Sequence, residues 1–155
     1  MIIQHEIRLA TQHDAQAIAC LSRDCIERGL GWRWTPQRVL RGIVNPAVNV
    51  VVCHEAGGLS GFGIMHYGDE EAHLLLLAVQ PARRRRGVAT ALLTWLEQCA
   101  RAAGVGSIWL EMRSANSGAG AFYRSLGYRQ LGRVRGMYSG IEDGARFAKD
   151  LWESA

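Results

Sequence analysis

The stretch VQPARRRRGVATALL, residues 79–93, places four consecutive arginines between an apolar run and a segment with helical periodicity. The preceding residues AHLLLLAV (72–79) are the most continuous apolar run, typical of a central strand buried on both faces. After the arginines, apolar side chains recur at i, i+3 and i+4 over residues 88–99, and Gly104 provides a C-terminal stop. The stretch is therefore predicted to be a strand, a basic turn and a helix.

A glycine-containing turn that enters a helix is an anion site, because free amide N–H groups and the positive end of the helix dipole converge there. The sequence has no P-loop pattern, and Gly61-Phe-Gly63 and Gly104-Val-Gly106 lack the third glycine of a dinucleotide-binding fingerprint. A nucleic-acid surface would interleave basic and aromatic residues or spread the basic ones over a face. The clustered arginines therefore favour a small anionic ligand over a solvated charge run or a nucleic acid.

The rest of the chain alternates between helical and strand patterns. Two helices are expected early, one capped by Thr11 and stopped by Gly29, the other opened by Thr35-Pro36. The sequence predicts a mixed α/β fold, with a mostly antiparallel sheet of six or seven strands flanked by about four helices. The expected strands are 49–55, 59–67, 72–79, 107–113, 128–134 and 145–151, the last two around the loop GMYSGIEDG (136–144), and the fourth helix is 116–126.

Length and composition fit one globular domain. The chain has 155 residues, 48% hydrophobic and 21% charged, and we expect a single domain over 1–155. The start MIIQHEIRLA has no signal-peptide pattern and no apolar run is long enough to cross a bilayer, which predicts a cytoplasmic protein with no membrane partner. The four cysteines lack metal-site spacing, so we expect reduced thiols and no metal. The net charge of +4 suits an acidic partner such as a nucleotide-like cofactor or RNA.

Two motifs together resemble the GNAT acetyltransferase superfamily. Arg84-Arg-Arg-Gly87-Val-Ala89 matches R/Q-x-x-G-x-G/A, the acetyl-CoA signature of that superfamily. LEMRSANSGAGAFYRSLGY (110–128) is similar to its L-E-x-R-x-x-N-x-x-A-x-x-x-Y-x-x-x-G-[FY] region. Over residues 77–128 the chain looks most like the bacterial ribosomal-protein-alanine N-acetyltransferases. The resemblance implies a GNAT-like fold and an acetyl-CoA-dependent N-acetyltransferase.

The resemblance also implies which residues bind the cofactor. They come from the end of the apolar strand, the arginine turn and the two helix starts that follow, and not all four arginines need touch phosphate. Asn116 is in addition a typical helix N-cap, and the two roles are compatible. The expected set is Leu77, Ala78, Val79, Arg84, Arg85, Arg86, Gly87, Val88, Ala89, Thr90 and Asn116.

In the N-terminal acetyltransferases that the chain resembles, a Glu accepts the proton of the amine and a Tyr twelve positions later donates one. The matching residues here are Glu111 and Tyr123. Tyr123 also falls on the apolar stripe of its helix, so core packing is the alternative role. The resemblance further suggests the Val79 N–H as the donor that stabilises the oxyanion.

A carboxylate in the apolar strand 107–113 is costly unless paired, so the alternative role of Glu111 is an ion pair with Arg113 or Arg135. Other superfamily members place the base on or near the strand that corresponds to 72–79. His73, Glu70 and Glu71 therefore remain rival bases.

The acceptor is less well defined. In this superfamily the connection between the first two helices often borders the acceptor site, which puts Trp32 and Trp34 there or, alternatively, over the core. His73 and the late-loop pair Met137-Tyr138 are further candidates. The lead acceptor is a protein N-terminal amine, ribosomal-protein-like, and a small amine or amino-acid-like metabolite is the alternative. A non-catalytic acyl-CoA sensor and a basic nucleic-acid-binding module are the rival classes, and the resemblance allows a homodimer.

Overall fold

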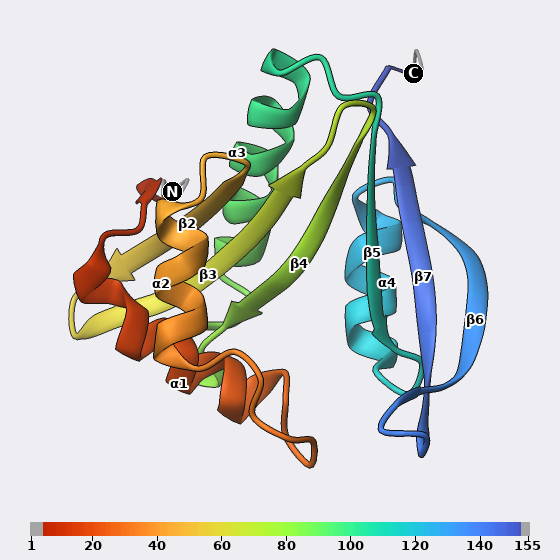
Figure 1. Cartoon of the computed structure of the whole chain (residues 1–155), viewed down its shortest axis with the longest axis horizontal. Coiled ribbons are helices and arrows are strands. Elements are labelled where there is room, and N and C mark those ends of the chain that lie inside the picture. The colour runs from red at the N-terminus through yellow and green to blue at the C-terminus, as the bar shows by residue number, and fades with distance from the viewer. Residues whose placement is uncertain (1–4, 153–155) are drawn as a thin grey trace.

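The computed structural model describes residues 5–152, which form one seven-stranded sheet in the order β1-β2-β3-β4-β5-β7-β6 (Figure 1). Only the β4–β5 pair is parallel. The predicted mixed α/β fold, mostly antiparallel and with four helices, is confirmed. The elements are β1 (Ile7–Leu9), α1 (Ala15–Cys25), α2 (Pro36–Val44), β2 (Val48–Glu55), β3 (Gly58–Tyr67), β4 (Glu71–Val79), α3 (Val88–Ala102), β5 (Ser107–Arg113), α4 (Ser117–Ser125), β6 (Arg129–Tyr138) and β7 (Glu142–Asp150), with short 3-10 turns at Gln12–Asp14 and Pro81–Arg83.

Three boundaries differ from the sequence prediction. β1 has three residues, too few to show an alternating pattern, and was not expected. α1 ends at Cys25, before the predicted stop at Gly29. The expected loop 136–144 is mostly strand, because positive φ angles at Gly136, Ser139 and Gly140 let β6 and β7 approach and turn tightly.

The helices cover the two faces of the sheet unequally. α3 and α4 share one apolar core with the sheet, which includes Leu92, Leu96, Ile108 and Phe147. α1 and α2 form a second core on the opposite face, over β2, β3 and β4. Among residues 5–152, no helix lies in front of β5, β7 and β6 on that second face (Figure 1). Side chains that point there from β5 and β7 are therefore open to a ligand.

β4 contains a bulge that changes the face to which its side chains point. Ile64 pairs with Leu76 and Met65 with Leu74, so Leu75 is an extra residue without a partner on β3. Leu74 consequently joins the α3 core, while Leu76 joins the α1–α2 core. The predicted central position of β4 is confirmed, but the prediction of burial on both faces is wrong in part, since alternate residues are only partly buried.

β4 and β5 separate after the bulge. Their parallel pairing runs from Glu71–Ser107 to Leu74–Leu110 and then stops, although both strands continue. Figure 1 shows the two strands diverging below this point, with α3 and α4 behind them. The second half of β4 therefore has an edge toward β5 that no strand covers.

The N-terminal part is fixed by the Asp14 carboxylate, which is 6% exposed. It accepts hydrogen bonds from Arg8 Nη1 (3.0 Å) and the Thr11 N–H (2.8 Å) and pairs with His54 Nε2 (3.0 Å). Burial acts to raise the pKa of Asp14, but these partners outweigh it and lower the pKa to about 2. Asp14 thereby ties β1 to β2.

Asp14→Asn is expected to lower the free energy of unfolding by ~2 kcal/mol at pH 7. Because the pKa of the carboxyl is lower in the folded chain, its contribution is present above pH 4 and is lost as the pH falls toward 2. Urea unfolding of both proteins at pH 7 and pH 3 measures the difference. An equal difference in the free energy of unfolding between the two proteins at both pH values would contradict this assignment.

Within the described part of the chain, no helix is long and apolar enough to cross a membrane.

Candidate active site

The turn between β4 and α3 has the backbone shape of an anion site. Arg85 has φ 63° and Gly87, the N-cap of α3, has φ 84°. The first intrahelical bond of α3 runs from the Ala91 N–H to the Gly87 carbonyl (3.0 Å), so the N–H groups at the start of the helix have no helical acceptor. These groups, at the positive end of a helix of 15 residues, suit a phosphate or pyrophosphate.

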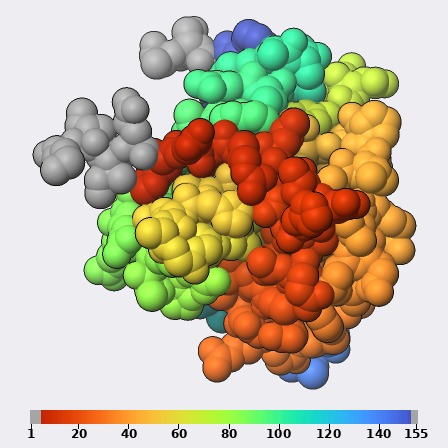
Figure 2. All heavy atoms as spheres, turned by 90° about the vertical axis from the view of Figure 1, so that its left-hand side faces the viewer, coloured from red at the N-terminus to blue at the C-terminus, as the bar shows by residue number. Residues whose placement is uncertain are grey.

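The four arginine side chains have different surroundings. The Arg83 guanidinium donates to Ser60 Oγ (2.9 Å) and the Ala56 carbonyl (3.1 Å), and so fixes the β2–β3 turn against this segment (Figure 2). Arg84 Nε donates to the Val79 carbonyl (3.2 Å). Arg86 pairs with Glu55 at 3.3 Å.

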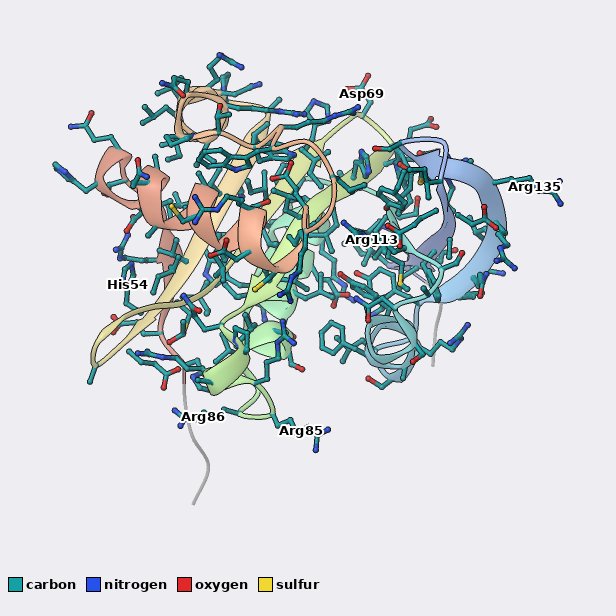
Figure 3. The ribbon with its side chains drawn as sticks, turned by 90° about the horizontal axis from the view of Figure 1, so that it is seen from below. His54, Asp69, Arg85, Arg86, Arg113 and Arg135 are labelled. Carbon is teal, nitrogen blue, oxygen red and sulfur yellow. The ribbon has the colours of Figure 1, made fainter. Side chains whose placement is uncertain are left out.

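Arg85 has no ion pair among the described residues, and both Arg85 and Arg86 point outward at this end of the molecule (Figure 3). Arg83 therefore has a structural role, since it binds the β2–β3 turn. Arg85 and Arg86 leave positive charge exposed at the turn before α3.

Gly87→Ala is expected to weaken acetyl-CoA binding about tenfold, since an L side chain at positive φ costs roughly 1–2 kcal/mol and the turn must change shape. A Cβ at Gly87 would meet no atom closer than 3.8 Å, so the effect reflects backbone conformation and not a clash. Calorimetric titration with acetyl-CoA measures it. Gly132→Ala, where nothing lies within 4 Å and φ is ordinary, is the matched control; equal affinities in both variants would contradict the prediction.

The free edge of β4 presents backbone donors toward β5. The Gln80 N–H donates to the Ser60 carbonyl (2.7 Å), so the backbone of Gln80 faces β3. Because alternate residues of an antiparallel strand point to opposite sides, the N–H groups of Val79 and Leu77 face the separation between β4 and β5. Two of the predicted cofactor residues thus have backbone groups directed into it.

Glu111 lies one residue beyond the last β4–β5 pair, on the face of β5 that no helix covers. Its Oε2 accepts a hydrogen bond from Arg146 Nη2 (2.7 Å), which comes from the position opposite on β7. The ion pair of the alternative role is thus present, but its predicted partners are wrong: Arg113 pairs with Glu142, and Arg135 points away into solvent (Figure 3). Glu111 thus stands, paired and partly exposed, where the two strands begin to separate.

Tyr123 lies on the opposite side of the sheet from Glu111, because α4 packs on the α3 face. Its ring makes edge contacts with Phe122 and Tyr128 at centroid distances of 5.1 and 5.7 Å. Burial raises the pKa of Tyr123 well above its ordinary value, so the phenol is protonated at neutral pH. Within residues 5–152 its hydroxyl makes no hydrogen bond, which leaves that group available to a ligand. Core packing and a role at the site are both compatible with this position.

The rival bases lie farther along the strands. His73 is opposite Trp109 and stacks on it at 3.6 Å, and burial lowers the pKa of its imidazole. Glu71 is opposite Ser107, four positions from Glu111 and about 13 Å along the sheet. A hollow of about 550 Å³ beside this end of β4 contains His73 and Glu71 and also Glu70. Of the three, only His73 is close to the point where the strands separate.

The connection between α1 and α2 is organised by a buried carboxylate that the sequence analysis did not single out. Glu27 is 8% exposed and accepts hydrogen bonds from Ser22 Oγ (2.9 Å) and from the N–H groups of Arg33 (2.7 Å) and Trp34 (3.2 Å). Trp34 packs against the α1–α2 core, as its alternative role required. Trp32 donates its indole N–H to the Ala19 carbonyl (3.2 Å) and is 37% exposed.

Tyr138 and Arg113 complete the side of the site nearest the β6–β7 turn. The Arg113 guanidinium lies 5.9 Å from the Tyr138 ring centre. Burial raises the pKa of Tyr138, and the nearby Glu111 carboxylate raises it further. Tyr138 therefore borders the surface on which Arg113 lies, whereas its neighbour Met137 is directed at Gly144 of β7.

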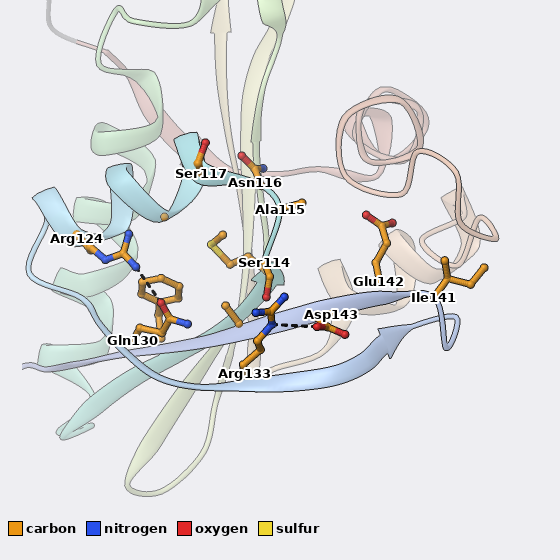
Figure 4. Close-up of a pocket in the computed structure, with 14 residues that line it drawn as sticks. Ser114, Ala115, Asn116, Ser117, Arg124, Gln130, Arg133, Ile141, Glu142 and Asp143 are labelled. Atoms are coloured by element: carbon orange, nitrogen blue, oxygen red, sulfur yellow. Dashed lines mark hydrogen bonds and ion pairs between the residues drawn. The ribbon is translucent and has the colours of Figure 1, made fainter.

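Asn116 caps α4 by accepting a hydrogen bond from the Ala119 N–H (3.1 Å). A cavity of about 590 Å³ lies between α4 and the β6–β7 hairpin (Figure 4). Arg124 pairs there with Gln130 (2.9 Å), and Arg133 pairs with Asp143 (3.0 Å). Asn116, at the start of α4, therefore both caps the helix and lines this cavity.

Among residues 5–152, no three His, Cys, Asp or Glu side chains are grouped as ligands of a metal ion would be. All four cysteines are free thiols, as expected, and only Cys53 is fully buried.

The one parallel strand pair of the described chain, β4 and β5, thus separates beside a turn whose backbone has the shape of an anion site. The family model described as "Acetyltransferase (GNAT) family" matches residues 10–128. The chain belongs to this family. In overall fold it is similar to yncA from Salmonella typhimurium, whose structure was determined with its cofactor acetyl-CoA: the TM-score is 0.81 at 20% identity, over 99% of this chain and 97% of that one.

Two curated relatives carry names of N-acetyltransferases. The [Ribosomal protein bS18]-alanine N-acetyltransferase of Haemophilus ducreyi is 37% identical over 92 residues, which are 59% of this chain and 63% of that protein. The N-alpha-acetyltransferase RimI of Mycobacterium tuberculosis is 33% identical over 111 residues, 68% of this chain and 67% of that protein. The alignment with the Haemophilus protein thus spans less than two thirds of that relative's length.

Proposed function

We propose that this chain, as one N-acetyltransferase domain over residues 1–155, transfers the acetyl group of acetyl-CoA to a protein N-terminal amine, of the ribosomal-protein kind. The observation that carries the proposal is the separation of β4 from β5 after Leu74 and Leu110. The anion-binding turn lies at one end of this separation, and Glu111 lies at the other. Two relatives named for acetylating protein N-termini support the choice of acceptor.

The residues present fit the cosubstrate. Backbone N–H groups of residues 85–90 are assigned to the pyrophosphate, because the helix start leaves them unpaired. The free edge of β4, from Leu77 to Val79, and the cap residue Asn116 are assigned to the pantetheine arm. Acetyl-CoA supplies the acyl group as a thioester, whose sulfur is a fair leaving group with a thiol pKa of about 8.5.

Three groups carry the chemistry in this proposal. Glu111 accepts a proton from the acceptor ammonium, directly or through a water, because only the neutral amine is nucleophilic. The Val79 N–H donates to the carbonyl oxygen on which negative charge develops. Tyr123 gives its phenolic proton to the departing sulfur. His73 is less suited to be the base, since its ring is stacked on Trp109 two positions before Glu111.

The uncovered face of β5 and β7 supports a macromolecular acceptor. It is bordered by residues 26–28 of the α1–α2 connection, which Arg113 contacts, by Tyr138 and by the His73–Trp109 stack. The polar Glu111–Arg146 pair lies at its centre. An extended N-terminal segment can lie on such an open face, whereas a small metabolite needs a closed pocket.

Thiol release from acetyl-CoA by the purified protein tests the proposal, with N-terminal peptides compared against free amines and amino acids. Turnover on peptides supports it. Turnover restricted to a small amine would replace the acceptor class, and acetyl-CoA binding without turnover on any acceptor would favour an acyl-CoA sensor. No acetyl-CoA binding, together with salt-sensitive RNA binding, would favour a nucleic-acid module and overturn the proposal.

A further inference from the structure

Arg113 joins three segments that border the uncovered face of β5. Its Nη2 donates to the carbonyls of Ile26 (3.0 Å) and Arg28 (2.6 Å), at the end of α1, and its Nη1 pairs with Glu142 (3.1 Å) at the start of β7. Its side chain is only 23% exposed. Figure 3 shows it between the α1–α2 connection and the β6–β7 strands.

These contacts are suited to hold a loop in place. The last carbonyls of a helix have no intrahelical partner, and a cation near the helix C-terminus is favourable. The planar guanidinium can donate to two carbonyls and a carboxylate at once, which a lysine ammonium cannot match in geometry. Arg113 therefore fixes the position of residues 26–28 relative to β5.

The same loop is held from inside by Glu27. While the carbonyls on either side of it point to Arg113, the Glu27 carboxylate points inward and accepts the N–H groups of Arg33 and Trp34. The segment 26–34, which includes Trp32, is thus held in two ways. Arg113 binds two of its carbonyls from outside, and the Glu27 carboxylate binds two of its N–H groups from inside. Of the two, Arg113 lies two residues after Glu111 on the same face of the strand.

We infer that Arg113 is a positioning residue that sets the distance between Glu111 and the acceptor-side loop 26–34, and so determines how well the acceptor binds. The inference rests on the proposed function. Among the described residues, Arg113 forms its ion pair with Glu142, while Glu111 pairs with Arg146. The influence of Arg113 on turnover therefore passes through the loop.

Arg113→Gln is the primary test, in steady-state kinetics with the peptide that the wild-type protein turns over best. The KM for the peptide should rise about tenfold, because two carbonyls lose their donor, while the KM for acetyl-CoA and kcat change less than threefold. Arg113→Lys should recover part of the loss. Glu27→Gln, which weakens the other attachment of the loop, should raise the same KM without altering the pH dependence of kcat.

Arg133→Gln is the matched control, since it also breaks an arginine–carboxylate pair of the hairpin, with Asp143, but has no contact with the loop. It should leave both KM values unchanged. The inference is overturned if Arg113→Gln changes both KM values equally, or if Glu27→Gln leaves the peptide KM at the wild-type value. Absence of turnover in the wild type would instead overturn the proposed function, so the two failures are distinguishable.

Discussion

Glu111→Gln is expected to lower kcat/KM for an N-terminal peptide by about 10²–10⁴-fold at pH 7, the usual contribution of a general base. The glutamine keeps the size of the side chain but cannot accept the proton of the ammonium. An N-terminal amine has a pKa of about 7.7–8.0, so its neutral fraction grows as the pH rises. The ratio of wild-type to variant rates should therefore shrink between pH 7 and pH 9, which thiol release at a series of pH values measures.

The ion pair with Arg146 needs a separate control, because Glu111→Gln also removes that contact. Arg146→Gln breaks the same pair but keeps the carboxylate. It should retain activity within about tenfold of the wild type if Glu111 acts as a base. Equal losses in both variants, or a Glu111→Gln deficit that does not depend on pH, would show that the pair is needed for structure and that another group takes the proton.

Tyr123→Phe is expected to lower kcat by about 10²-fold or more, within the range of general acids, with little change in the KM for acetyl-CoA. The ring contacts with Phe122 and Tyr128 are kept, so the loss measures the hydroxyl alone. A thiolate leaves more easily as the pKa of its thiol falls. The loss of kcat in Tyr123→Phe should accordingly be smaller with an acyl donor whose leaving thiol is more acidic than that of coenzyme A. Pre-steady-state thiol release with both acyl donors measures the difference.

Tyr128→Phe provides the matched control on the neighbouring ring. Its hydroxyl donates to the buried Glu97 carboxylate (2.8 Å), which also pairs with Lys149 (3.1 Å). Removing it should lower the melting temperature, because a buried acceptor loses a partner, and leave kcat within a few fold. If Tyr128→Phe reduces kcat as much as Tyr123→Phe does, the effect comes from packing and the role of Tyr123 as a proton donor is wrong.

Features that depend on neighbouring residues were predicted well from the sequence. The turn before α3 needs a residue that accepts positive φ, and Gly87 occupies that place next to a periodic helix. The N-caps Thr35 and Asn116 make the expected bonds to the N–H groups of their helices. Such signals are local, and they suffice to order the helices and most of the strands.

Features that depend on strand register could not be predicted. The partner of Glu111 is Arg146 because β7 inserts between β5 and β6, and nothing in either strand alone fixes that order. The bulge at Leu75 is invisible in an apolar run, since a leucine suits either face of a buried sheet. The buried Glu27 has an ordinary helix-end sequence, and its function appears only when the loop folds around it.

The extra residue in β4 has a consequence for engineering. Deleting Leu75 would restore a regular alternation along the strand and allow β4 and β5 to continue their hydrogen bonds past Leu74. A shortened chain of this kind could gain backbone pairing, yet it would lose the space that the proposed cosubstrate occupies. Natural sequences often accept such a stability–activity compromise. Here it is concentrated in one leucine, so the length of β4, more than its composition, keeps the space between β4 and β5 open.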